Sequence, residues 1–161
     1  MKKNIPRTIL KLCGFFLIAN LPFLTISQLV GVDTFIDSFK HPSSYLYIKS
    51  EKLHDTDTNA GYIILEQSTN QGFSIHEGDQ ILYHTMKDSL QQYIVYQVRS
   101  HDGITSYYTT GSSGDTNGPI YEHQVVGKII GRSQDTLWNT LCLQLWDFSI
   151  NNLNAVTLFS V

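Results

Sequence analysis

The hydrophobic pattern divides the chain into one long apolar run, a series of short strand-like segments and a tail with helical spacing. Residues 12–32 carry no charge, and a helix of that length, at about 1.5 Å per residue, can cross a bilayer. Between Gly78 and Gly131, pieces rich in Val, Ile, Tyr and Thr are bounded by Gly, Asp, Asn or Ser. This pattern predicts successive antiparallel strands joined by tight turns, and therefore a mainly β domain built around a meander.

The expected strands follow one another at short intervals. The central ones cover residues 78–84, 93–98, 106–111 and 124–131, with a loop at 114–117, and two earlier ones cover 44–50 and 62–66. Asp102-Gly103, between the second and third central strands, supplies the positive φ that a two-residue hairpin turn needs.

The tail changes to helical spacing after the last strand. Its large apolar residues are Leu137, Trp138, Leu141, Leu145 and Trp146, and they indicate an amphipathic segment from residue 135 to about residue 148. This segment is too polar to span a membrane. We interpret it as a helix or strand pair packed on the sheet, with a helix lying in a membrane interface as the alternative.

Basic residues are concentrated before the apolar run. Four of the eleven Lys and Arg residues lie in the first eleven positions, and from position 12 onward seven basic residues face fourteen acidic ones, a net charge of −7. The positive-inside rule then predicts a cell-membrane protein with a single-pass anchor in the lipid bilayer, a cytoplasmic N-terminus and an extracytoplasmic body. A cleaved signal peptide is the alternative, although no Ala-x-Ala-like site follows the run. The acidic body argues against nucleic acid as a partner.

Length and composition suit one domain without an evident cofactor. The chain has 161 residues and 42% hydrophobic content, enough for a core of its own. Cys13 and Cys142 lie far apart and form no disulfide framework or Cys-based metal site, so we interpret both as small buried apolar residues. The six histidines show no ligand spacing such as His-x-x-x-His, and we predict no cofactor and no metal site from them.

One acidic loop carries part of a calcium-binding pattern. Counted from Asp55, oxygen-bearing residues occupy loop positions 1, 3, 5 and 12, the last being Glu66, which is the spacing of an EF-hand loop. Position 6 should be Gly and is Ala60, and the flanks are expected strands instead of helices. We interpret the segment as a solvated acidic loop, with calcium binding as the alternative.

The order of the motifs resembles a known family. A Gly-Asp-x-hydrophobic-x-Tyr strand at 78–83, an Ile-Val-x-x-Val strand at 94–98, a Gly-Asp-x-Asn loop at 114–117 and the strand Gln-Val-Val-Gly-Lys-Ile-Ile-Gly at 124–131 are similar to those of the archaeal and endoplasmic-reticulum type of signal peptidase I, serine peptidase family S26. The resemblance covers residues 5–132 or so and implies a membrane-anchored serine endopeptidase fold. Its parts would be a basic cytoplasmic N-terminus (1–11), a transmembrane anchor (12–32), a β-rich, barrel-like extracytoplasmic domain (33–132) and an amphipathic tail (133–161).

The resemblance also implies a catalytic site. Ser44 is the match to the nucleophile in the family's Ser-Gly-Ser-Met-x-Pro motif, although Ser43 and Tyr45 replace the Gly and Met and the Pro is absent. Tyr96 stands where the family has a His or Lys base, and a phenol with an ordinary pKa near 10 accepts a proton poorly at neutral pH. Asp115 matches the acidic residue of the Gly-Asp-x-Asn loop. From the residues alone, Ser43, Ser44 and Asp115 are better explained as turn residues.

Three functions stay open on this basis. The first is a catalytically degenerate relative that keeps the anchor and binds extended peptides or partner proteins, by strand addition to an exposed sheet edge. The second is an active serine endopeptidase that removes signal peptides from exported pre-proteins, using Ser44 with a substitute base such as His84 or His101. The third is an unrelated anchored extracytoplasmic β-domain, either with or without bound calcium.

Overall fold

The computed structural model of the chain describes residues 7–50, 61–68, 72–86, 89–111, 114 and 116–158. The helices are α1 (Arg7–Val30), α2 (Val32–Lys40) and α3 (Leu137–Leu158). The strands are β1 (Tyr45–Lys49), β2 (Gly61–Gln67), β3 (Gln80–His84), β4 (Leu90–His101), β5 (Ile104–Thr110), β6 (Thr116–Tyr121) and β7 (Val125–Gln134). Two short 3-10 turns, η1 (Pro42–Ser44) and η3 (Glu122–Gln124), lead into β1 and β7.

The strands form one antiparallel sheet in the order β1-β2-β7-β3-β4-β5-β6. β3 to β6 follow one another as a meander, which confirms the mainly β fold predicted from the sequence. β7 then returns to lie between β2 and β3, where Lys128 pairs with Glu66 on one side and with Ile81 on the other. Within the described part of the chain β1 and β6 are the edges, so the sheet is open and the predicted barrel-like closure is not formed.

The turn between β4 and β5 has the predicted geometry. Asp102 and Gly103 adopt φ values of 52° and 78°, as a two-residue hairpin turn requires. The segment predicted as a loop at 114–117 differs, because β6 begins at Thr116. Gly118 and Pro119 weaken any strand prediction there, and β6 accommodates them because it is an edge strand.

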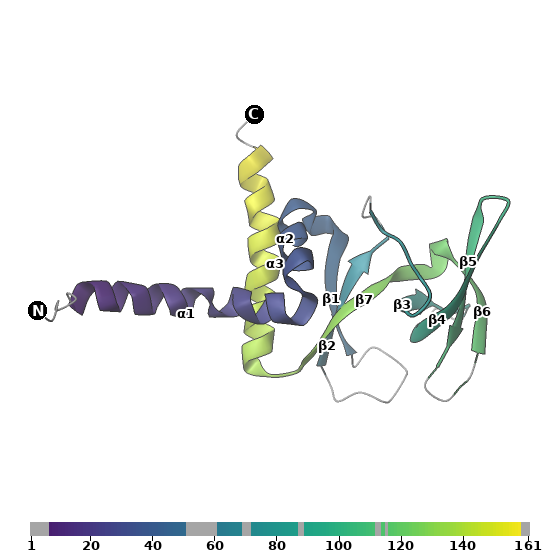
Figure 1. The fold of residues 1–161 in the computed structure, drawn as a ribbon, viewed down its shortest axis with the longest axis horizontal. Helices are drawn as coiled ribbons and strands as arrows, with labels where there is room; N and C mark the ends of the chain where they lie inside the picture. The colour runs from purple at the N-terminus through teal and green to yellow at the C-terminus, as the bar shows by residue number, and fades with distance from the viewer. Residues whose placement is uncertain are drawn as a thin grey trace, which may run out of the picture.

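The predicted apolar helix over residues 12–32 is broken near its end. α1 stops at Val30, and α2 starts after Gly31, whose φ of 87° suits glycine. In the described ranges no single helix is long and apolar enough to span a bilayer, whereas Gly14–Val30 and α2 together pass that test across a bend of 110°. Figure 1 shows the N-terminal half of α1 projecting away from the body, on the side of α3 opposite the sheet.

The hydrophobic residues form separate clusters on the two ends of the sheet. The helical core joins the C-terminal half of α1 and α3 to β1 and β2, and contains Ile26, Val30, Tyr45, Ile64, Cys142, Leu143, Trp146 and Ile150. The meander core contains Ile75, Ile81, Tyr83, Val95, Tyr107, Ile120 and Val125. The amphipathic tail is therefore a helix packed on the sheet, and Cys142 is buried as predicted; the side chain of Cys13 lies outside the described residues.

Candidate functional site

Ser44, the predicted nucleophile, ends the turn η1 between α2 and β1. Its backbone N–H donates to the carbonyl of His41 at 3.0 Å, and the residue is only 4% exposed. In the described part of the chain no histidine or lysine is hydrogen-bonded to its hydroxyl. The turn therefore holds Ser44 directly before the edge strand β1, where it is largely shielded from solvent.

Tyr96, at the position of the expected base, lies on another part of the sheet. It is the bulged residue where the pairing of β4 with β5 passes from Val95 to Gln97. β2, β7 and β3 lie between β1 and β4, which is about 19 Å across the sheet at roughly 4.8 Å per strand. Tyr96 is 45% exposed, and the structure does not place it beside Ser44. Asp115, the third predicted residue, lies outside the described residues.

The alternative bases are not on β1 either. His84 ends β3, and its carbonyl accepts a hydrogen bond from Gln124 at 3.4 Å. His101 lies in the exposed β4–β5 hairpin, with its Nε2 3.3 Å from the carboxylate of Asp102. The sheet therefore places these histidines on different strands from the one that Ser44 leads into.

The acidic loop of the calcium alternative falls mostly outside the described residues, since residues 51–60 are not described. Its last member, Glu66, lies on β2 with its carboxylate 3.5 Å from the Lys128 ammonium. Among the residues that the structure does describe, no three His, Cys, Asp or Glu side chains are grouped to hold a metal ion.

A groove opens around η3, at the end of the meander that lies away from the helices. It consists of two adjoining cavities of about 570 and 580 Å³ that share Thr105, Glu122 and His123. The first is also lined by Phe73, Ile75 and Tyr107, and the second by Ile104 and Tyr121. The first cavity has polar and apolar walls in about equal measure, and the second is mainly apolar. Cavities of this volume are typical of binding sites. We call the two cavities together the η3 groove.

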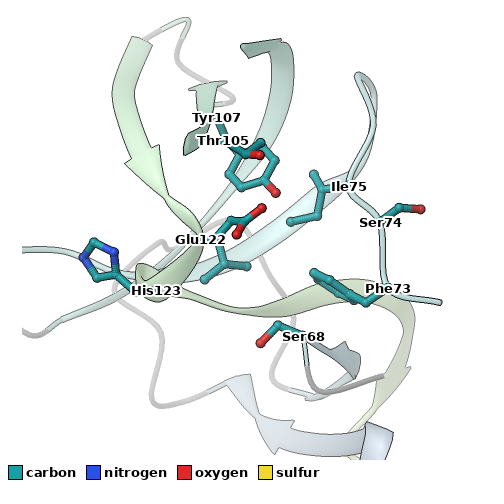
Figure 2. A pocket seen from close by; sticks show the side chains of 9 residues that line it. Ser68, Phe73, Ser74, Ile75, Thr105, Tyr107, Glu122 and His123 are labelled. Carbon is teal, nitrogen blue, oxygen red and sulfur yellow. The ribbon is translucent and has the colours of Figure 1, made fainter. Parts of the chain in front are cut away.

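Two polar groups converge in the first cavity. Tyr107 is 5% exposed, and Figure 2 shows its hydroxyl and the Glu122 carboxylate on the same side of the cavity, near Ile75. Burial, and then the negative charge of Glu122, raise the pKa of Tyr107. At neutral pH the site therefore presents a neutral hydroxyl donor and a carboxylate side by side.

Local hydrogen bonds hold the wall of the groove in place. The backbone N–H of Tyr121 donates to the side-chain oxygen of Gln124 at 3.0 Å, which closes the turn that carries Glu122. The rings of Tyr121 and His123 stack, with centroids 6.0 Å apart and planes 6° from parallel. The sequence reasoning missed this site because Tyr-Glu-His-Gln at 121–124 has the composition of an ordinary solvated turn. The only available signal was a tyrosine-rich strand, residues 106–111, before it.

A second surface is apolar and lies at the opposite end of the molecule. Five residues in the projecting half of α1 are exposed by 63 to 73%: Leu12, Phe15, Phe16, Leu17 and Ile18. On α3, four apolar residues at helical spacing are exposed by 38 to 64%: Trp138, Leu141, Leu145 and Phe148. The indole N–H of Trp138 donates to the hydroxyl of Thr25 on α1 at 3.2 Å, so the exposed face of α3 begins where the two helices cross. We call these nine residues the apolar helix surface.

Comparison of the chain with protein-family models, with curated proteins and with solved structures found no match. The resemblance to signal peptidase I therefore rests on the four motifs and their order.

Proposed function

We propose that the protein is a membrane-attached, non-catalytic binding protein, which inserts the apolar helix surface into lipid and holds an extended segment of a partner polypeptide at the sheet. The observation that carries this proposal is the exposure of Leu12, Phe15, Phe16, Leu17 and Ile18 along one projecting helix. A continuous exposed apolar surface of this kind is uncommon on a soluble monomer and marks an interaction with a membrane or another protein.

The length of the exposed stretch of α1, which continues past the middle of the helix to Leu21 (45% exposed) and Leu24 (55% exposed), suits insertion into a bilayer. From Leu12 to Leu24 the helix extends about 18 Å at 1.5 Å per residue, which exceeds half of a hydrocarbon core of about 30 Å. Asn20 and Thr25 donate side-chain hydrogen bonds within the helix, of 2.7 and 3.0 Å to the carbonyls of Phe16 and Leu21. These bonds satisfy the Thr25 hydroxyl donor and one of the two Asn20 amide donors, which lowers the cost of placing them in lipid.

The exposed face of α3 would then lie against the membrane surface. Its apolar residues from Trp138 to Phe148 alternate with a buried face that contains Leu143 and Trp146, so one side of the helix is held by the sheet and another is free for lipid. A tryptophan at the helix crossing suits the boundary between headgroups and hydrocarbon. The sheet extends from the side of α3 opposite the projecting half of α1 (Figure 1).

A non-catalytic role agrees with the placement of the predicted peptidase residues. Ser44 is nearly buried, and three strands lie between its strand and that of Tyr96. A serine nucleophile needs a general base within hydrogen-bond distance. Binding without cleavage needs only a groove or a free strand edge, and the sheet offers both at β6 and η3.

Flotation with liposomes tests the attachment. The full chain, mixed with phospholipid vesicles and centrifuged through a density gradient, should rise with the vesicles and resist alkaline carbonate. The double variant Phe15→Asp/Phe16→Asp should stay at the bottom, because each carboxylate in the hydrocarbon region costs about 2.5–3.5 kcal/mol. Met86→Asp/Ile94→Asp, a matched change at two exposed apolar residues of the β-domain outside the apolar helix surface and the η3 groove, should float like the wild type.

Two results would contradict the proposal. If the Phe15→Asp/Phe16→Asp variant floats as well as the wild type, the apolar helix surface is not the attachment site. If the purified chain hydrolyses a pre-protein substrate and Ser44→Ala abolishes that turnover, the protein is a peptidase and not a binding protein.

A further inference from the structure

We propose that the η3 groove binds a polypeptide through one positively charged side chain, lysine or arginine, seated against Glu122 and Tyr107, with an apolar side chain of the same segment in the adjoining cavity. This proposal deepens the proposed function, since it rests on polypeptide binding and specifies which sequences are bound.

The first step is the free carboxylate of Glu122. Within the described residues it forms no ion pair. Lys128, on β7, is engaged elsewhere, because its ammonium donates to the Ser74 carbonyl at 3.1 Å and lies 3.5 Å from Glu66 and 4.0 Å from Asp79. Glu122 therefore offers an unpaired negative charge at the shared wall of the two cavities.

The second step is the surroundings of that carboxylate. Figure 2 shows the Tyr107 ring and hydroxyl on one side of the first cavity and the Phe73 ring on the other. Aromatic faces with a carboxylate favour a cation on a long apolar stem, since the stem packs on the rings while the charge meets the carboxylate. A bidentate arginine–carboxylate contact would be the strongest form of this pairing.

The third observation is that a second cavity adjoins the first. It is lined by Ile104, Tyr121 and the stacked His123 ring, and shares three residues with the first cavity. In an extended chain, alternate side chains lie on the same face about 7 Å apart. Adjoining cavities at the end of the edge strand β6 thus suit residues i and i+2 of an added strand, one basic and one apolar.

Fluorescence anisotropy with a defined probe tests this specificity. The full chain in detergent micelles is titrated into labelled acetyl-Thr-Arg-Thr-Leu-Thr-amide and into the same peptide with Gln in place of Arg. The arginine peptide should bind about 2- to 5-fold more tightly, because an ion pair with an exposed carboxylate such as that of Glu122 adds a modest, measurable affinity. Glu122→Gln should remove that preference, whereas Glu77→Gln, at an exposed turn outside the groove, should keep it.

The outcomes separate this proposal from the attachment of the chain to lipid. Equal binding of both peptides by the wild type, or an unchanged arginine preference in Glu122→Gln, would overturn the assignment of the groove. Flotation of Glu122→Gln with liposomes like the wild type would show that the folded, attached protein was tested. If the wild type prefers the arginine peptide but does not float, the groove assignment stands and the attachment fails.

Discussion

The two halves of α1 have similar composition but different surroundings. In the C-terminal half, Ile26 is fully buried and Val30 is 7% exposed, because they pack against α3 and the β1–β2 end of the sheet. In the N-terminal half, Phe15 and Phe16 are 73 and 69% exposed. The same kind of residue therefore forms a core in one half of a helix and an unpartnered surface in the other.

This difference shows that packing against α3 sets the boundary between the buried and the exposed part of α1. Trp146 is 1% exposed and its indole N–H donates to the hydroxyl of Ser38 at 2.9 Å, which joins α3 to α2. Ser38 in turn donates to the carbonyl of Phe35 at 2.7 Å. Beyond the crossing with α3, no described element covers α1, so its apolar residues there stay exposed in the described part of the chain.

The largest effect that we expect comes from deleting the side chain at the centre of the helical core. Trp146→Ala should lower the free energy of unfolding by about 3–5 kcal/mol, since it leaves a cavity and removes the hydrogen bond to Ser38. Urea titration in detergent micelles, followed by far-ultraviolet circular dichroism, measures this loss. Phe16→Ala, an equally large apolar change in the exposed half of α1, should shift the free energy of unfolding by less than about 0.5 kcal/mol.

If Phe16→Ala destabilised the protein as much as Trp146→Ala, the contrast between the two halves of α1 would be wrong. Trp146→Phe sharpens the measurement, because it keeps most of the apolar volume and loses the N–H donor. Its free energy of unfolding should lie between those of the wild type and of Trp146→Ala.

A smaller effect on stability is expected from a pair of glycines, one packed against α1 and the other in its exposed half. A Cβ at Gly131 on β7 would lie 2.8 Å from the carbonyl oxygen of Leu29 on α1, so Gly131→Ala should push the helix off the sheet and cost about 1–3 kcal/mol. A Cβ at Gly14, in the exposed half, would meet nothing within 4 Å. Gly14→Ala should leave stability unchanged or raise it by up to about 1 kcal/mol, because alanine favours the helix. Thermal melts of both variants in the same micelles compare them directly, and a loss in Gly14→Ala larger than that in Gly131→Ala would contradict the packing.

Much of the fold could be predicted because local signals agreed with the tertiary structure. The strands are short runs rich in Val, Ile, Tyr and Thr between turn residues, and Asp102-Gly103 has the sequence and the positive φ values of a two-residue turn. The sheet order could not be predicted, since the return of β7 between β2 and β3 depends on contacts far apart in sequence. β6 was missed because Gly118 and Pro119 oppose the strand and only the edge position permits them.

The candidate site was harder to predict than the fold. Motif order directed attention to Ser44 and Tyr96, but motifs carry no information about which strands become neighbours in the sheet. The η3 groove depends on bringing Phe73, Tyr107 and Glu122 together from separate elements. A single acidic residue in a turn gives no sequence signal, so only the folded arrangement reveals the unpaired carboxylate.

The smallest effect expected within the helical core is a pH dependence at Tyr45. Its hydroxyl donates to the Asp37 carboxylate at 2.7 Å, and burial, followed by this hydrogen bond, raises its pKa well above the ordinary value. A phenol whose pKa is raised by folding stabilises the protein fully below the unfolded pKa of about 10, and this stabilisation is lost as pH rises above that value. Tyr45→Phe should therefore cost about 1 kcal/mol at pH 7 and lose less further stability between about pH 9 and 11 than the wild type does. Urea titrations across that range, with Tyr96→Phe on the exposed part of β4 as the control, measure both effects. Equal alkaline losses in the wild type and Tyr45→Phe would mean that the contact between α2 and β1 does not couple to pH, and that the buried tyrosines of the meander, Tyr83 and Tyr107, account for the alkaline sensitivity instead.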